Sequence, residues 1–204
     1  MSRFSQAISE GDGISIIPAL AGDVAALAGI AEATGAEAVA VEAADVERAR
    51  AHTSLPIIAR HSDPRALSAT GADACIVVFG AVADAAAALE DVYALAREIG
   101  LDCAVDVRDE DELEGALERV DPDIVLISER ELDRNEEDLE RTLDLLADVP
   151  AGKLVISEAR VVAREQVVAL ERAGVDAVLV RELAGGSDFS AALGELLHGS
   201  GASH

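Results

Sequence analysis

Short runs of consecutive apolar residues recur along the chain, and segments with helical periodicity lie between them. Apolar residues at successive positions, rather than at alternate ones, are typical of parallel strands that are covered on both faces. We expect eight strands, near residues 14–19, 37–42, 56–59, 73–79, 102–107, 123–128, 153–158 and 176–180. The clearest helix is expected at 82–99, and shorter ones at 109–119 and 164–173.

One phrase occurs three times along the chain. It consists of a glycine, an acidic residue two positions later, and an apolar run, at residues 35–41 (GAEAVAV), 71–77 (GADACIV) and 174–180 (GVDAVLV). Glycine adopts the left-handed backbone conformation that commonly ends a helix, and β-branched residues favour strands. Each copy therefore predicts a junction from a helix into a strand.

Strands that alternate with helices, at roughly 20–35 residues per unit, indicate a parallel sheet joined by crossover helices. Eight such units predict an α/β fold, a small (β/α)8 TIM barrel, and 204 residues is near the lower end for that fold. A doubly wound open sheet is the alternative, but no GxGxxG follows the first strand. We assign residues 1–12 to an N-terminal segment, 13–198 to the barrel and 199–204 to a flexible tail, with a hinge at 185–187.

The composition predicts an aliphatic core, because half of the residues are hydrophobic yet there are no Trp, one Tyr and three Phe residues. No apolar run approaches the ~20 residues that span a bilayer, and the first residues lack a signal-peptide pattern, so we expect a cytoplasmic protein. Cys75 and Cys103 lie in strand-like runs and are interpreted as buried small hydrophobes. A disulfide or a metal pair is the alternative for these two cysteines.

The formal net charge is −24, from 40 acidic and 16 basic residues, and the single lysine is Lys153. Such a surface repels the phosphates of nucleic acids and anionic membranes, so neither is expected as a partner. Because salt screens self-repulsion, the acidity suggests adaptation to a salt-rich cytoplasm. A coding bias towards Ala, Arg, Asp and Glu explains the scarcity of lysine equally well.

Several segments resemble indole-3-glycerol phosphate synthases. Residues 101–114 (LDCAVDVRDEDELE) resemble their fifth strand and following helix, 154–158 (LVISE) their seventh strand and 173–180 (AGVDAVLV) their eighth. Residues 55–58 (LPII) are similar to the third strand, and 4–17 to the short segment that leads into the first. The likeness spans nearly the whole chain and implies a phosphate-binding barrel, although the family's long N-terminal helical extension is mostly missing.

The catalytic positions implied by this resemblance are Arg60, Asp106 and Glu158. That family closes an indole ring with loss of carbon dioxide and water, which requires a proton donor and carboxylates at the carboxyl ends of the strands. Arg60 occupies the position of the catalytic lysine, and a guanidinium group is a poor general acid. The family's Glu-x-Lys on the first strand reads Ala19-Leu20-Ala21, and Lys153 precedes the seventh strand, at the opposite mouth.

The ligand-binding positions implied by the resemblance are substituted as well. The sixth-strand Asn-Asn-Arg reads Ser128-Glu129-Arg130, and the seventh-strand Glu-Ser-Gly reads Glu158-Ala159-Arg160. Arg181 replaces the glycine of the phosphate cup and is followed by a retained Glu182. We expect anion-binding residues at Ser128, Arg130, Arg160, Arg181 and Glu182.

Replacing glycine by arginine either fills the phosphate cup or changes how an anion is held, from backbone N–H groups to guanidinium groups. We therefore expect an ion network of Arg60, Asp106, Glu158 and Arg181 at the mouth. This network is either an anion site for a different ligand or a self-satisfied cluster that closes a disused pocket. His61 with Asp106 and Glu158 is a weaker alternative as a metal site, and no metal or cofactor is expected.

The sequence thus predicts a diverged relative of these synthases that has lost the indole-forming carboxy-lyase reaction. It would bind a different anionic or phosphorylated small ligand, or act as a structural or regulatory partner of another protein or of a second copy. The alternatives are a working synthase of tryptophan biosynthesis, a carbon–carbon lyase with a rearranged site, and another sugar-phosphate isomerase or aldolase-type barrel. Whether the chain is an enzyme at all is left open.

Overall fold

Eight parallel strands form a nearly closed barrel in the computed structural model, which describes residues 2–11, 13–82, 88–128, 139–181, 183 and 188–199. Neighbouring strands pair in the order β1-β8-β7-β6-β5-β4-β3-β2. The strands are β1 (Ser15–Pro18), β2 (Val39–Glu42), β3 (Ile57–Arg60), β4 (Ala74–Val78), β5 (Asp102–Val107), β6 (Ile124–Ser128), β7 (Leu154–Ala159) and β8 (Ala177–Val180). The predicted (β/α)8 barrel is confirmed, and the open sheet is not what the chain forms.

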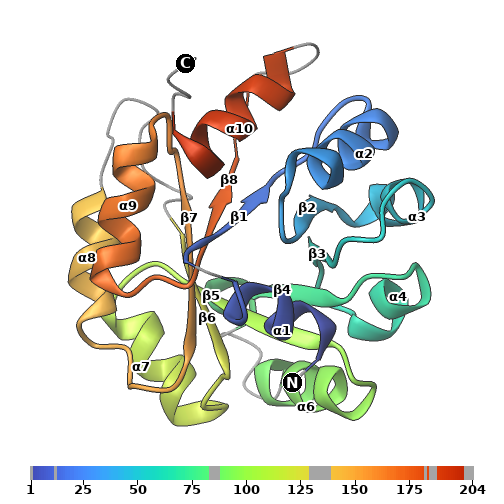
Figure 1. Ribbon diagram of the computed structural model, residues 1–204. Coiled ribbons are helices and arrows are strands. Elements are labelled where there is room, and N and C mark those ends of the chain that lie inside the picture. Colours follow the sequence, from blue (N-terminus) through green and yellow to red (C-terminus); the bar gives the residue numbers. More distant parts are fainter. Residues whose placement is uncertain are drawn as a thin grey trace.

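Helices form a ring around the strands, as Figure 1 shows. They are α1 (Arg3–Ser9), α2 (Val24–Thr34), the short 3-10 helix η1 (Ala43–Asp45), α3 (Val46–Arg50), α4 (Pro64–Ala69), α5 (Phe79–Val82), α6 (Ala88–Glu98), α7 (Glu110–Arg119), α8 (Leu139–Leu146), α9 (Arg164–Ala173) and α10 (Phe189–His198). Residues 83–87 of the helix predicted at 82–99 lie outside the described part of the chain, as does the hinge predicted at 185–187.

Phe79, which was expected to end the fourth strand, begins α5 instead. Its ring packs against α7 at Gly115, where an added Cβ would lie 2.6 Å from the Phe79 Cζ atom. The Arg119 guanidinium group lies 5.8 Å from the centroid of the same ring. The apolar run therefore continues beyond the end of β4 into Phe79, which packs against a helix. The apolar pattern alone does not show where the strand ends.

The strands separate two apolar layers, because alternate side chains of a strand point to opposite faces. Outward-facing residues such as Ile57, Val105 and Val178 pack under the helices. Inward-facing strand residues fill the barrel and are aliphatic, for example Ala104, Leu126 and Ile156. The barrel interior is thus a packed core and not a channel.

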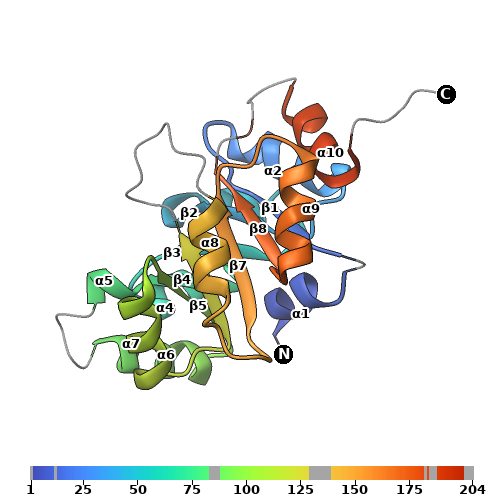
Figure 2. The same ribbon diagram turned by 90° about the vertical axis from the view of Figure 1, so that its left-hand side faces the viewer.

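Helix α1 lies at the end of the barrel from which the strands start, and Figure 2 shows it from the side. Phe4 and Ile8 are buried and belong to the apolar cluster inside the barrel. The backbone N–H of Ser5 donates to the Asp102 carboxylate at 2.7 Å, which anchors the helix to the start of β5. The N-terminal segment therefore closes the floor of the barrel.

The acid of each repeated phrase ties its strand to the preceding one. Each carboxylate accepts a backbone N–H from the start of the neighbouring strand, in the pairs Glu37–Ile16 (3.2 Å), Asp73–Ile57 (2.8 Å) and Asp176–Val155 (2.7 Å). Burial raises the pKa of Glu37 and of Asp176, and the hydrogen bonds only partly oppose that effect. The repeat is thus a structural device at the floor of the barrel, away from the carboxyl ends of the strands.

The junction between β1 and β2 is the weakest of the barrel. Among the described residues, a single bridge between Ala19 and Ala40 joins these strands, with the Leu20 N–H donating to the Ala40 carbonyl at 2.8 Å. The other neighbouring strands pair along full ladders. The barrel is therefore a rolled sheet whose two edges meet near the carboxyl end of β1.

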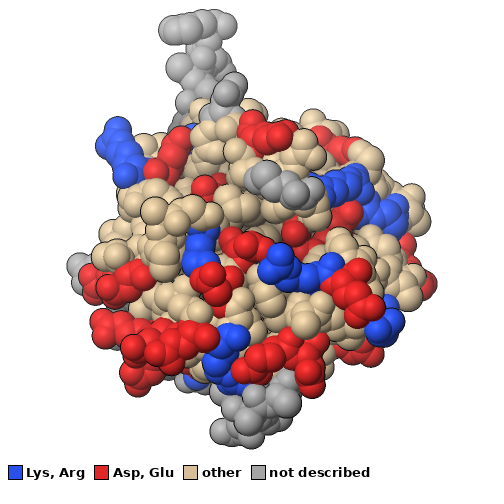
Figure 3. Space-filling model, turned by 90° about the horizontal axis from the view of Figure 1, so that it is seen from below, with Lys and Arg blue, Asp and Glu red and all other residues tan. Residues whose placement is uncertain are grey.

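The surface reflects the composition. Figure 3 shows many Asp and Glu side chains on one face, with Lys and Arg side chains between them. No helix in the described ranges is long and apolar enough to cross a membrane. Cys75 and Cys103 face each other across β4 and β5 and are buried free thiols, and the hydrogen bond with Cys75 together with burial raises the pKa of Cys103.

Candidate ligand site at the mouth of the barrel

The inward-facing positions change from apolar to polar at the carboxyl ends of the strands. Two residues beyond each inward apolar residue, the side chain again points into the barrel. This relation places a charged or polar group above an apolar one in the pairs Ala40 and Glu42, Ile58 and Arg60, Ala104 and Asp106, Leu126 and Ser128, and Ile156 and Glu158. The strand period alone thus collects these side chains at the mouth.

Arg60, at the end of β3, joins two carboxylates that come from β5 and β7. Its Nη1 pairs with the Asp106 carboxylate, and its Nη2 lies 2.7 Å from Oε2 of Glu158. Ser128 donates its hydroxyl to the other Asp106 oxygen at 2.5 Å. The Asp106 side chain is 0% exposed and that of Glu158 6% exposed, so Arg60 pairs with two buried charges that would be costly without a partner.

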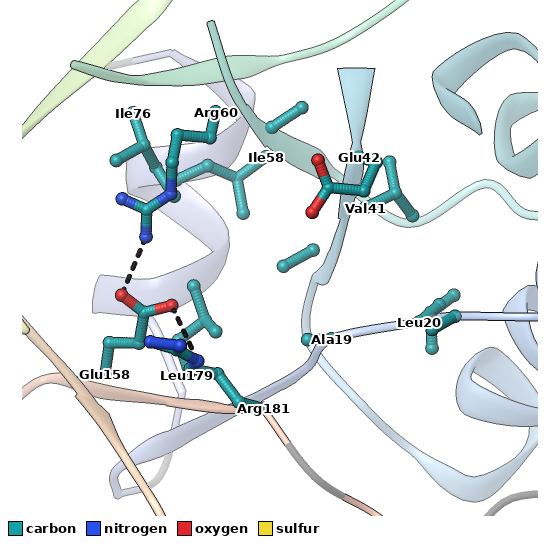
Figure 4. A pocket seen from close by; sticks show the side chains of 13 residues that line it. Ala19, Leu20, Val41, Glu42, Ile58, Arg60, Ile76, Glu158, Leu179 and Arg181 are labelled. Atoms are coloured by element: carbon teal, nitrogen blue, oxygen red, sulfur yellow. Dashed lines mark hydrogen bonds and ion pairs between the residues drawn. The ribbon is translucent and has the colours of Figure 1, made fainter. Parts of the chain in front are cut away.

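Arg181, just past β8, makes a looser contact with the same network. Its Nε lies 3.7 Å from Oε1 of Glu158, and its side chain is 45% exposed. Figure 4 shows Glu158 between Arg60 and Arg181. Among the residues that the structure describes, Glu158 is the partner of Arg181, and the exposed part of the guanidinium group remains accessible to a ligand.

A cavity of about 270 Å³ opens beside this network, above the end of β1. Its walls are mostly apolar, with charged groups on two sides (Ala19, Leu20, Ala21, Ala40, Val41, Glu42, Ile58, Ala59, Arg60, Ile76, Glu158, Leu179 and Arg181). The space exists because the residues after β1 are Ala19-Leu20-Ala21, where the resemblance leads one to expect a glutamate and a lysine. Asp106 and Ser128 lie outside its lining.

Glu42 is a member of this lining that the sequence analysis did not single out. It ends β2, is exposed, and lies across from Arg60 in the register of β2 and β3. Figure 4 shows its carboxylate directed into the cavity, on the wall facing Arg181. Glu42 is the last residue of β2 and follows the inward-facing Ala40 by two residues. This spacing predicts an inward-facing side chain and could have identified Glu42 from the sequence.

The remaining predicted site residues lie elsewhere or outside the described part of the chain. Arg160 is exposed just past β7 and does not line the cavity. Arg130 and Glu182 lie outside the described residues. Lys153 is at the floor of the barrel, where its Nζ contacts Asp121 at 2.6 Å and the Pro122 carbonyl at 3.0 Å.

His61 lies beside Arg60 but is turned into its own loop. Its Nδ1 accepts the backbone N–H of Asp63 at 2.9 Å. Within the described ranges, no three His, Cys, Asp or Glu side chains are grouped as metal ligands. The carboxylates of Asp106 and Glu158, which a site with His61 would require, are both engaged with Arg60.

The arrangement is suited to holding an anion and unsuited to donating a proton from an amine. Guanidinium groups present several N–H donors to a carboxylate or phosphate and keep their protons at any relevant pH. The sequence has one lysine, and Lys153 lies at the opposite end of the barrel. The mouth therefore offers cationic hydrogen-bond donors beside an open cavity.

Known proteins match the chain in sequence and in structure. The family model of indole-3-glycerol phosphate synthase matches residues 57–196. The structure is similar to that of an N-acetylmannosamine-6-phosphate 2-epimerase from Clostridium perfringens, with a TM-score of 0.68 and 16% identity over 86% of this chain and 88% of that one. It is also similar to QR15, an aldolase, with a TM-score of 0.71 and 13% identity over 90% and 94% of the two chains. At these identities the two structures show the shared barrel fold alone.

Proposed function

Because the chain belongs to the indole-3-glycerol phosphate synthase family, we propose that it is a member that no longer forms indole and that binds a small ligand through the ligand's anionic group. The observation that carries the proposal is the position of Arg60, which is held between Asp106 and Glu158. A group with a permanent charge and two ion pairs does not serve as a general acid.

Asp106, which stands at the position of the family's fifth-strand glutamate and is one methylene shorter, supports the same proposal. Asp106 is fully buried and accepts from Arg60 and Ser128, so its carboxylate faces protein donors instead of the cavity. The neighbouring β1 wall contributes Ala19 and Ala21, which have no acid or base to offer. The groups that remain at the cavity bind and orient, and the exposed Arg181 is the donor to which a ligand's anion has access.

The protein is expected not to catalyse the indole-forming reaction of its family. Incubation with carboxyphenylaminodeoxyribulose phosphate is expected to yield no indoleglycerol phosphate above the uncatalysed rate, in dilute buffer and in molar KCl alike. Indole fluorescence measures the product directly, since the protein contains no Trp.

Arg60→Lys is the matched variant for this assay, because it restores an amine at the family's position. It is expected to stay inactive, since the residues after β1 remain Ala19-Leu20-Ala21. Turnover by the unmodified protein at an ordinary enzymatic rate, on the order of 1 s⁻¹ or faster, would overturn the proposal. Activity that appears only in the lysine variant would show that this one substitution removed the reaction.

A further inference from the structure

Two opposite charges face each other across the cavity. The Arg181 guanidinium group lies beside Glu158 on the side of β8, and the Glu42 carboxylate enters from the side of β2 (Figure 4). No hydrogen bond or ion pair joins the Glu42 carboxylate to any residue in the described ranges. We propose that the cavity binds a small zwitterion, an aliphatic α-amino acid or a close analogue, with its carboxylate on Arg181 and its ammonium group on Glu42.

This inference rests on the proposed function, because Arg181 is the anion-binding group in both, and it adds the second charge. Strands β2 and β8 are the two neighbours of β1, so their backbones lie about 10 Å apart across it. The small side chains of Ala19 and Ala21 leave the space between them open. The two charged side chains therefore belong to walls on either side of β1.

The charge of the lining favours a ligand without net charge. Two guanidinium groups and two carboxylates line the cavity, and Asp106 lies beneath them (Glu42, Arg60, Glu158 and Arg181). A phosphate dianion would add negative charge to a lining that already contains two acids and two bases and lies above the buried Asp106. A zwitterion adds none, and it gives Glu42 a partner while Arg181 gains one as well.

The rest of the lining accommodates an aliphatic side chain. Leu20, Val41, Ile58, Ile76 and Leu179 form the apolar walls. The volume of about 270 Å³ falls just below the range of roughly 300–1,000 Å³ typical of pockets for drug-sized ligands. A branched amino acid such as leucine or valine therefore matches the site in charge, polarity and size.

Matched ligands test each charge separately by isothermal titration calorimetry. L-leucine carries both groups, 4-methylpentanoate lacks the ammonium group, and 3-methylbutylamine lacks the carboxylate, while all three share the isobutyl side chain. L-valine with 3-methylbutanoate repeats the comparison for a smaller side chain, and inorganic phosphate serves as a plain anion. Leucine or valine is expected to bind about 10- to 100-fold more tightly than the acid or the amine derived from it.

Three variants assign the contacts. Glu42→Gln is expected to reduce affinity for the amino acid to that of its deaminated acid and to leave the acid's own affinity within about threefold. Arg181→Gln is expected to abolish binding of the acid and the amino acid together. Glu47→Gln removes the same charge from the exposed face of α3, outside the cavity lining, and controls for a change in net charge.

The outcomes separate this inference from the proposed function. If the deaminated acids or phosphate bind as tightly as the amino acids, and Glu42→Gln changes nothing, the zwitterion is wrong and the anion site stands. If none of the probes binds at about 10 mM, both are wrong, because an affinity weaker than that corresponds to less than about 3 kcal/mol of binding free energy. If the amino acid binds with the stated dependence on Glu42 and Arg181, the inference holds.

Discussion

Arg60 does what a lysine in its position could not do. Its planar fork reaches Asp106 through one amino group and Glu158 through the other, whereas an ammonium group is a compact point charge. Both carboxylates are almost fully withdrawn from water, and a buried charge without a partner is costly. At the residue scale, Arg60 is therefore a structural requirement of the mouth as well as its cation.

Arg60→Met is expected to destabilise the protein by about 3–5 kcal/mol near pH 8, as is usual when one partner of a buried ion pair is removed. In this variant both carboxylates stay buried without their main cationic partner, and a buried charge without compensation is costly. Urea unfolding of the variant and of the unmodified protein at pH 8 measures the difference.

The triple variant R60M/D106N/E158Q is the matched control for this experiment. It removes all three charges of the cluster, and it should recover part of the lost stability, because no buried carboxylate is left without a partner. A penalty for Arg60→Met that is below about 1 kcal/mol at pH 8, as for exposed pairs, would contradict the structural role.

Sequence comparison identified the members of the ion network but missed Glu42. The resemblance points to the positions that the family uses for catalysis and ligand binding. The ion pairs at the mouth join residues at four such positions (Arg60, Asp106, Glu158 and Arg181). Glu42 is found by the strand period instead, since it follows the inward-facing Ala40 by two residues. Arg160 follows Glu158 by the same spacing, yet β7 ends at Ala159, so the period no longer determines its direction.

At the scale of elements, all eight strands were predicted to within two residues at each end. Several apolar runs are preceded by a glycine and an acid, and several are followed by an inward polar residue, which limits where those strands can begin and end. The packing of a particular helix could not be predicted in this way. The contact between Phe79 and Gly115 depends on how α5 and α7 approach each other, which no local pattern records.

Two glycines inside helices give a matched test of that packing. Gly194→Ala in α10 is expected to stabilise the protein by about 0.5–1 kcal/mol, because the new methyl group has ordinary contact with Thr34 and the helix gains propensity. Gly115→Ala in α7 is expected to destabilise it by about 1–3 kcal/mol, because the methyl group would collide with the Phe79 ring. Thermal unfolding measures the change in melting temperature of each variant. Equal changes in the two variants would refute the close contact between Gly115 and the Phe79 ring.

The whole molecule carries a charge of −24, which the barrel must tolerate in its folded form. Salt shortens the range of the repulsion, from about 10 Å at 0.1 M to about 3 Å at 1 M. We expect the melting temperature to rise between dilute buffer and molar KCl. Sucrose at matched osmolarity is the control for a general effect of solutes, and a melting temperature that does not depend on KCl would favour coding bias as the origin of the acidity.

The junction of β1 and β2 has a consequence for how this barrel deforms. Seven of its contacts between neighbouring strands are ladders, and the eighth is the bridge of Ala19 with Ala40, both of which line the cavity. Widening the barrel there breaks fewer backbone hydrogen bonds than widening it elsewhere. We therefore expect thermal fluctuations, and any structural adjustment to a bound ligand, to be largest at the junction of β1 and β2. The cavity can then change its width while the part of the mouth around Arg60 keeps its shape.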